Sequence, residues 1–139
     1  LNKGAPKYSC LSKCGSNTTL YGLFENKQSI LDKKEIIIFE GEKSVMKCDG
    51  WGINTAVAAL TSHLNDAQIH ALIKLGVSVV IAFHKGINPA SDSNIRKLKH
   101  FVSVSAIIDN KGLLEDKDAP VDKGREVFNA LYQSKIRPN

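Results

Sequence analysis

Ionisable side chains follow three of the four apolar runs that read as buried strands. They are Glu40 and Glu42 after 35–39, His84 and Lys85 after 77–83, and Asp109, Asp118 and Asp122 after 102–108. Carboxylate oxygens are hard ligands for divalent cations, and Gly41 lets a phosphate or a metal approach the backbone behind Glu40. Cations held in this way stabilise the oxygens that attack and leave a phosphorus centre. The pattern therefore predicts phosphate chemistry at the strand ends.

Alternating strand-like and helix-like segments would position these groups. Continuous β-branched and aromatic runs predict buried strands, and amphipathic spacing predicts the helices between them. The expected strands are 35–39, 53–59, 77–83 and 102–108, and the expected helices are 22–31, 43–48, 66–75, 92–100 and 124–134. Asn65 is the expected N-cap of the third helix, and Gly76 its stop. The alternation predicts an α/β fold with a mostly parallel four-stranded sheet and helices on both faces.

Ligands of such a sheet bind beyond the carboxyl ends of its strands. Glu40 should therefore lie near Asp109, Asp118 and Asp122, around one pocket that opens to solvent. His84, at the third strand exit, is either a ligand or a hydrogen-bonded surface residue. The interpretation of the whole site depends on this convergence.

Composition and charge indicate one globular domain with a preference for anionic partners. The chain has 139 residues, 42% of them apolar, and a formal net charge of +5. Excess lysine and arginine favour a polyanion such as nucleic acid, although the same charge also serves solubility. The run Arg96, Lys97 and Lys99 could contact phosphate or form the solvated face of a helix. Trp51 could stack on a base or pack against the preceding helix.

Cysteine spacing and hydropathy exclude several other classes. Cys10, Cys14 and Cys48 are odd in number and lack a partner motif that would complete four ligands, so no zinc is expected. The chain has no apolar run of membrane-spanning length and no secretory signal, which favours a cytoplasmic location without a membrane partner. Because the first residue is Leu1, we expect a piece of a longer protein.

The order of short motifs carries a family resemblance across nearly the whole chain. The motifs are Pro6-Lys7-Tyr8, Tyr21-Gly22-Leu23, Ile36 to Phe39 with Glu40-Gly41-Glu42-Lys43-Ser44-Val45, Ala56 to Leu60, Leu64 to Gln68, Leu72 to Gly76 and Val79 to Phe83. This succession resembles the Toprim domain of bacterial and phage DnaG-type DNA primases. The resemblance implies a Toprim (Rossmann-like) fold over residues 25–139, and an N-terminal arm at 1–24 that corresponds to the end of the preceding primase core.

The resemblance also implies an activity and its ligands. Members of this family carry out metal-dependent nucleotidyl transfer, making RNA primers on single-stranded DNA from nucleoside triphosphates during DNA replication. Glu40 falls on the catalytic, metal-binding glutamate of the family, with magnesium or manganese as the metal. Asp109, Asp118 and Asp122 fall in the downstream acidic segment expected to add metal ligands, and Lys7 and Lys85 are the expected nucleic-acid or nucleotide contacts. A replicative helicase is an implied partner, through domains outside this chain.

The sequence departs from the family pattern after the third strand. His84-Lys85-Gly86 stands where the family has Asp-x-Asp, and Ser44 stands where many members have a further aspartate. Glycine supplies no ligand, and imidazole suits manganese or zinc better than magnesium. Two readings beside the active primase therefore stay open. One is a catalytically degenerate Toprim domain that binds nucleic acid or a partner, and the other is a Toprim nuclease.

Overall fold

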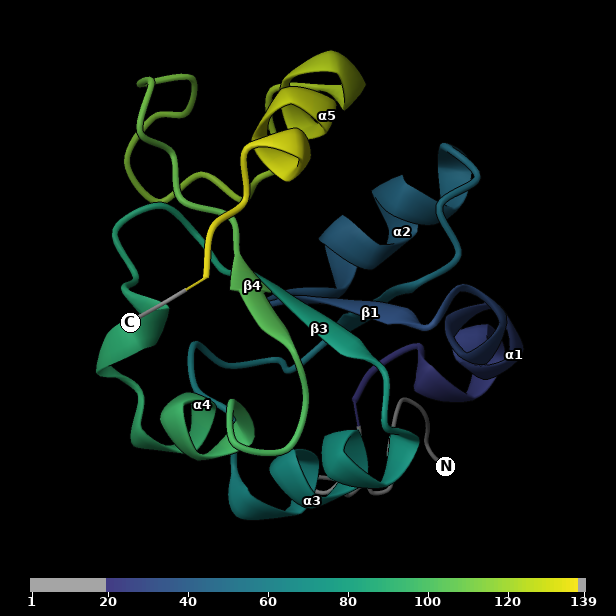
Figure 1. The fold of residues 1–139 in the computed structure, drawn as a ribbon. Coiled ribbons are helices and arrows are strands. Elements are labelled where there is room, and N and C mark those ends of the chain that lie inside the picture. Colours follow the sequence, from purple (N-terminus) through teal and green to yellow (C-terminus); the bar gives the residue numbers. More distant parts are fainter. Residues whose placement is uncertain (1–19, 138–139) are drawn as a thin grey trace, which may run out of the picture.

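The computed structural model describes residues 20–137, in which helices and strands alternate (Figure 1). The helices are α1 (Leu23–Lys33), α2 (Glu42–Gly50), α3 (Asp66–Leu75), α4 (Ser93–Leu98) and α5 (Arg125–Gln133), with a 3-10 helix, η2, at Pro89–Ser91. The strands are β1 (Glu35–Phe39), β2 (Ala56–Ala58), β3 (Ser78–Ala82) and β4 (Val104–Ala106). Lys7, Cys10, Cys14 and most of the predicted arm at 1–24 lie outside the described residues.

The four strands form one parallel sheet in the order β2-β1-β3-β4. Phe39, the last residue of β1, pairs with Ala58 of β2 and with Ala82 of β3. The carboxyl ends of these three strands therefore lie side by side. This confirms the predicted α/β fold and brings the residues after Phe39 and Ala82 together at one end of the sheet.

Helices cover both faces of the sheet and make three layers. Figure 1 shows α1, α3 and α4 on one face, with α2 and α5 on the other. The side chains of β1 explain this arrangement, because successive residues of a strand point to opposite faces. Ile36 and Ile38 enter one apolar cluster, and Ile37 and Phe39 enter the other. A strand that is apolar on both sides is thus buried between two helical layers.

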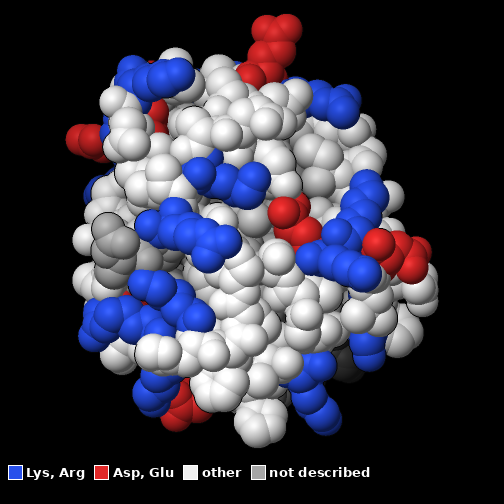
Figure 2. All heavy atoms as spheres, viewed as in Figure 1, with Lys and Arg blue, Asp and Glu red and all other residues white. Residues whose placement is uncertain are grey.

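Basic side chains dominate one side of the surface. Figure 2 shows lysines and arginines gathered over α4 and the segment that follows α5. The sequence explains this distribution, because residues 93–108 and 127–137 contain no aspartate or glutamate. Positive charge on these two segments is therefore not balanced by neighbouring carboxylates along the chain.

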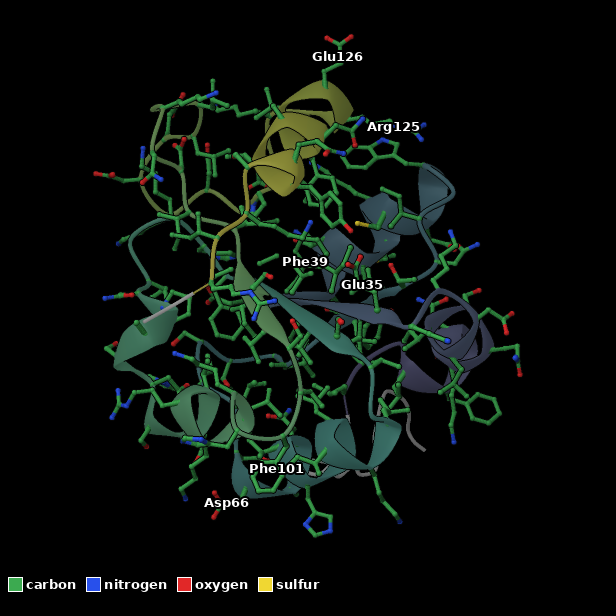
Figure 3. The ribbon with its side chains drawn as sticks, in the orientation of Figure 1. Glu35, Phe39, Asp66, Phe101, Arg125 and Glu126 are labelled. Carbon is green, nitrogen blue, oxygen red and sulfur yellow. The ribbon has the colours of Figure 1, made fainter. Side chains whose placement is uncertain are left out.

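The face beneath α2 and α5 is built around aromatic rings. Phe128 of α5 is 2% exposed, and its ring centroid lies 6.0 Å from that of Phe39 and 6.2 Å from that of Trp51. Figure 3 shows Phe39 on the side of the sheet that faces α5. Trp51 therefore packs against α5 as well as lying next to its own helix. Cys48 is buried in the same cluster, and burial raises the pKa of its thiol to about 12, so it acts as a small apolar residue.

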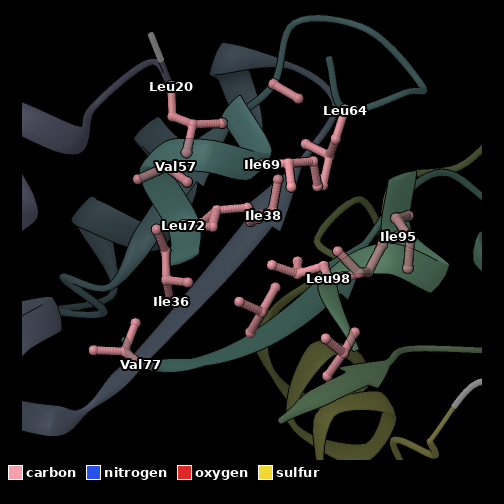
Figure 4. Close-up of a cluster of buried hydrophobic side chains, with 14 of the residues drawn as sticks. Leu20, Ile36, Ile38, Val57, Leu64, Ile69, Leu72, Val77, Ile95 and Leu98 are labelled. Atoms are coloured by element: carbon pink, nitrogen blue, oxygen red, sulfur yellow. The ribbon is translucent and has the colours of Figure 1, made fainter. Parts of the chain in front are cut away.

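The opposite face is filled by aliphatic side chains. Figure 4 shows Ile36 and Ile38 of β1 packed near Ile69 and Leu72 of α3. Ile95 and Leu98 of α4 join the same cluster, and both are fully buried. This cluster fixes α3 and α4 beneath β1 and β3, and therefore sets the position of the chain that leaves β3.

Most predicted elements agree with the structure, and their boundaries differ in understandable ways. The strand 35–39 and the helix 66–75 match residue for residue, the latter with the capping box of Asn65 and Gln68 and a left-handed Gly76. Asp92 caps α4 through its side chain, so the helix begins after it, at Ser93. The helix also ends earlier than predicted, at Leu98. The predicted strands 53–59 and 102–108 are reduced to three residues each, because only their centres pair in the sheet. In α1, Ile30 is fully buried, whereas Leu31 beside it is 39% exposed.

Two isolated bridges flank the parallel sheet. Tyr21 pairs with Ala58 through hydrogen bonds of 2.8 and 3.0 Å, and Ile136 pairs with Ala106 through bonds of 2.6 and 2.9 Å. Both bridges are antiparallel, and they anchor the two ends of the described chain to β2 and β4. Within residues 20–137, no helix combines the length and the apolar character that crossing a membrane requires.

Candidate functional site at the carboxyl ends of the strands

Glu40 links the exits of β1 and β3. Its Oε2 accepts a hydrogen bond of 2.7 Å from the backbone N–H of His84 and lies 3.5 Å from His84 Nδ1. The Glu40 side chain is 17% exposed and that of His84 is 36% exposed. Glu40 is thus oriented by the backbone of the neighbouring strand exit, while its side chain keeps some access to solvent.

A small cavity of about 360 Å³ opens beside Glu40. Its lining includes Ser44 from α2, His84 from the β3 exit, and Asp122 from the loop before α5. Two of the predicted metal ligands, Glu40 and Asp122, therefore face one cavity although 82 positions separate them in the sequence. Asp109 lines a different cavity, described below, and so takes no part in this one.

Asp109 is paired within the protein. Its side chain is 1% exposed, and its Oδ2 lies 3.0 Å from Lys85 Nζ. The backbone N–H groups of Leu113 and Leu114 also donate to its carboxylate, at 2.9 and 2.8 Å. Burial by itself raises the pKa of Asp109, but the two backbone donors and the Lys85 ammonium outweigh it and lower the pKa to about 2. Asp109 is a charged anchor of this loop.

Lys85 joins the β3 exit to the loop 109–118. Its Nζ donates to Asp109 and, at 2.9 Å, to the carbonyl of Leu114, while its backbone N–H donates to the carbonyl of Asp118 at 2.8 Å. The ammonium predicted to contact nucleotide is therefore engaged by protein groups, and its side chain is 27% exposed. Lys85 holds the acidic loop against the end of β3.

Asp118 and Asp122 shape the loop that carries them. Asp118 Oδ2 accepts from the backbone of Glu115 at 2.9 Å, and Asp122 Oδ2 accepts from the backbone of Ala119 at 2.9 Å. Lysines lie near both carboxylates, with Lys123 at 3.6 Å from Asp118 and Lys47 at 3.9 Å from Asp122. Each carboxylate thus has one oxygen committed to a turn.

The hydrogen bonds and ion pairs of these aspartates limit their ability to bind two divalent metal ions. In the part of the chain that the structure describes, no three His, Cys, Asp or Glu side chains come together in a group that could hold a metal ion. Two-metal sites require several carboxylates aimed at cations about 4 Å apart. Glu40 shares a cavity with Asp122, but Asp109 is paired with Lys85, and the described residues do not fit a two-metal site.

Gly86 explains part of this departure. Its backbone has φ of 101°, a conformation that side-chain-bearing residues rarely adopt. An aspartate at this position, as in the Asp-x-Asp pattern, would strain the turn by about 1–3 kcal/mol unless the turn changed. The turn at the β3 exit therefore favours glycine over aspartate at position 86.

A second and larger cavity was not foreseen from the sequence. It measures about 590 Å³ and lies between the β3 exit, η2 and the segment after α5. His84 lines both this cavity and the one beside Glu40. Ile136 and Arg137 form part of its wall, and the available sequence signal for them was the lack of carboxylates in 127–137.

Comparisons with known proteins place this geometry in a family. No family model matches the chain. The SPbeta prophage-derived uncharacterized protein YorJ of Bacillus subtilis is 35% identical over 138 residues, which is 84% of this chain and 36% of that protein. The DNA primase of Pseudomonas aeruginosa is 29% identical over 126 residues, covering 86% of this chain and 19% of the primase.

Solved structures agree with these relatives. A crystal structure of a DNA primase domain from Pseudomonas aeruginosa superposes with a TM-score of 0.64 at 26% identity, over 94% of this chain and 42% of that one. The chain carries a Toprim domain of the DnaG primase type. A DnaG primase catalytic domain bound to single-stranded DNA has the same fold, with a TM-score of 0.63 at 21% identity over 93% of this chain and 43% of that one.

The Toprim domain accounts for only part of these relatives. The chain spans about a third of the length of YorJ and about a fifth of the length of the curated primase it matches. The division into an arm at 1–24 and a Toprim domain at 25–139 stays a prediction. So do the roles of Lys7, Lys85 and the individual carboxylates.

Proposed function

We propose that this chain is the Toprim catalytic-core portion of a DnaG-like DNA primase that acts on single-stranded DNA in DNA replication. The observation that carries the proposal is the placement of Glu40 at the β1 exit, oriented by the β3 backbone and facing a cavity. The likeness to primases over 86–94% of the chain supports it. Nucleoside triphosphates are the proposed second substrate, and contact with a replicative helicase stays a prediction.

The divalent metal enters this proposal through the carboxylates that line the Glu40 cavity. Magnesium or manganese would supply charge neutralisation for a triphosphate, and Glu40, Glu42 and Asp122 are the carboxylates that line this cavity. Among residues 20–137, no three His, Cys, Asp or Glu side chains form a group that could hold even one metal ion. If primer synthesis occurs, the remaining ligands must come from water, from the substrate phosphates or from parts of the protein beyond those residues.

Replacing Glu40 with glutamine tests the proposal. On the longest natural form of the protein, with single-stranded template and manganese or magnesium, Glu40→Gln should reduce labelled primer product more than about tenfold, because the amide is a poor cation ligand. Glu126→Gln is the matched control, since Figure 3 shows Glu126 at the outer end of α5, and it should leave product unchanged. Equal product from Glu40→Gln and the parent protein would contradict the proposal.

A second candidate function is a catalytically degenerate Toprim domain that binds nucleic acid without transferring nucleotides. The ion pair between Lys85 and Asp109 favours this second function, because the Lys85 ammonium binds the carboxylate that a metal ion would need. On this reading single-stranded DNA binding persists without divalent metal and weakens with salt.

Restoring the family aspartates separates the two candidates. If the domain is degenerate, the double change His84→Asp and Gly86→Asp should raise primer product at least about tenfold in manganese, while His84→Asp alone gains nothing. The double variant should also lose about 1–3 kcal/mol of unfolding free energy, since Gly86 has positive φ. Robust product from the parent chain, with no gain in the double variant, would exclude the degenerate reading.

A further inference from the structure

The larger cavity has apolar walls and a basic rim. Ile87 and Pro89 from the β3 exit, Ile107 and Leu114 from the β4 side, and Ile136 contribute apolar surface. Its volume of about 590 Å³ lies within the range of small-ligand sites. The lining also includes the polar side chains of His84, Lys85, Asn88, Asp109 and Arg137, so the cavity suits a flat ring that carries hydrogen-bonding groups.

The rim is held in place by defined contacts. Two hydrogen bonds between Ile136 and Ala106 fix the C-terminal wall against β4, and Arg137 follows directly. On the other side, Arg96 Nη1 donates to the carbonyl of Ala90 at 2.8 Å, and Ala90 lines the cavity. Because a guanidinium has five N–H donors, this bond leaves most of the Arg96 donors available. Arg137 therefore lines the cavity itself, and Arg96 is bonded to a residue that lines it.

Charge complementarity points to the occupant. Arg96 and Arg137 belong to the two segments, 93–108 and 127–137, that lack carboxylates, and Figure 2 shows basic side chains gathered over both. Such a surface attracts a phosphate backbone, while an apolar pocket accepts a base that has left its stack. His84 lines this cavity and the Glu40 cavity alike, so a strand seated here would continue past the proposed catalytic glutamate.

We infer that the cavity between η2, β4 and the C-terminal segment receives one unpaired base of a single-stranded nucleic acid, with Arg96 and Arg137 contacting the flanking phosphates. This inference rests on the proposed function and deepens it, because it assigns the template a seat separate from the Glu40 cavity.

Binding of a labelled oligothymidylate, followed by fluorescence anisotropy at fixed salt, tests the inference on the whole chain. Arg137→Glu and Ile87→Asp should each weaken binding about fivefold or more, the first by repelling phosphate and the second by making the pocket polar. The matched controls are Arg125→Glu at the far end of α5 (Figure 3) and Met46→Asp on exposed α2, which should stay within about twofold of the parent.

The same assay separates a base from a phosphate. An oligomer carrying abasic sites should bind the parent chain about fivefold more weakly than the intact strand, and this difference should vanish in Ile87→Asp. Equal weakening by all four variants, or equal affinity for abasic and intact strands, would overturn the inference while leaving the proposed function standing. If the parent chain binds no single-stranded DNA at all, the proposed function and the inference both fail.

Discussion

Replacing Lys85 with methionine should lower the unfolding free energy of this domain by about 3 kcal/mol. The change leaves the Asp109 carboxylate, 1% exposed, without its ammonium partner 3.0 Å away, and it also removes the donor to the carbonyl of Leu114. Breaking a buried ion pair from one side costs about 3–5 kcal/mol, and we take the lower end because the lysine side chain is 27% exposed. Urea denaturation of both proteins measures the difference.

A surface lysine provides the control. Lys123 lies 2.8 Å from Glu115 and 3.6 Å from Asp118, but it is 36% exposed and Glu115 is 79% exposed. Lys123→Met should therefore cost much less unfolding free energy than Lys85→Met. Losses of equal size at Lys85 and Lys123 would mean that burial of Asp109 does not set the strength of its pairing.

The ion pair between Lys85 and Asp109 should also make the unfolding free energy depend on pH. The pKa of Asp109 is lowered from its usual 3.8 to about 2, so the folded domain binds this proton less readily than the unfolded chain. The resulting stability is present above about pH 3.8 and is lost as the pH falls from there toward 2. Removing the ammonium in Lys85→Met should weaken this part of the acid dependence, which denaturation at several pH values would detect.

Replacing Phe128 with alanine should destabilise the domain by about 4 kcal/mol. Phe128 is 2% exposed and its ring centroid lies within 6.2 Å of those of Phe39, Trp51 and Tyr132, so truncation leaves a cavity that three large rings cannot close. Thermal or urea denaturation measures the loss.

An exposed phenylalanine, Phe24, provides the control. Phe24 is 90% exposed, and Phe24→Ala should change stability by less than about 1 kcal/mol. If Phe128→Ala were as mild as Phe24→Ala, α5 would not depend on the ring cluster for its place on the sheet.

The fold could be predicted because its signals are local. The strand Glu35–Phe39 is apolar at every position after Glu35, which only a doubly covered strand requires, and Asn65 with Gly76 marks both ends of α3. The short strands β2 and β4 were overestimated, because apolar residues continue past the last pair of the sheet and pack in loops instead.

The site could be predicted only in part, because its contacts join distant segments. The sequence placed Glu40 at a strand exit, and the topology brought that exit next to His84. The loop 109–124 has no regular periodicity, so its carboxylates could not be oriented in advance. Lys85 reaches Asp109 across 24 positions, and no local pattern announces that a predicted ligand is already neutralised.

The two antiparallel bridges protect the edges of this sheet from pairing with other molecules. β2 and β4 are its outermost strands, and unpaired backbone groups along such strands invite aggregation with other molecules. Tyr21 blocks β2 at Ala58, and Ile136 blocks β4 at Ala106, each reversing the direction that a further parallel strand would need. The segments around Tyr21 and Ile136 thereby hinder edge-to-edge pairing of this sheet with other molecules.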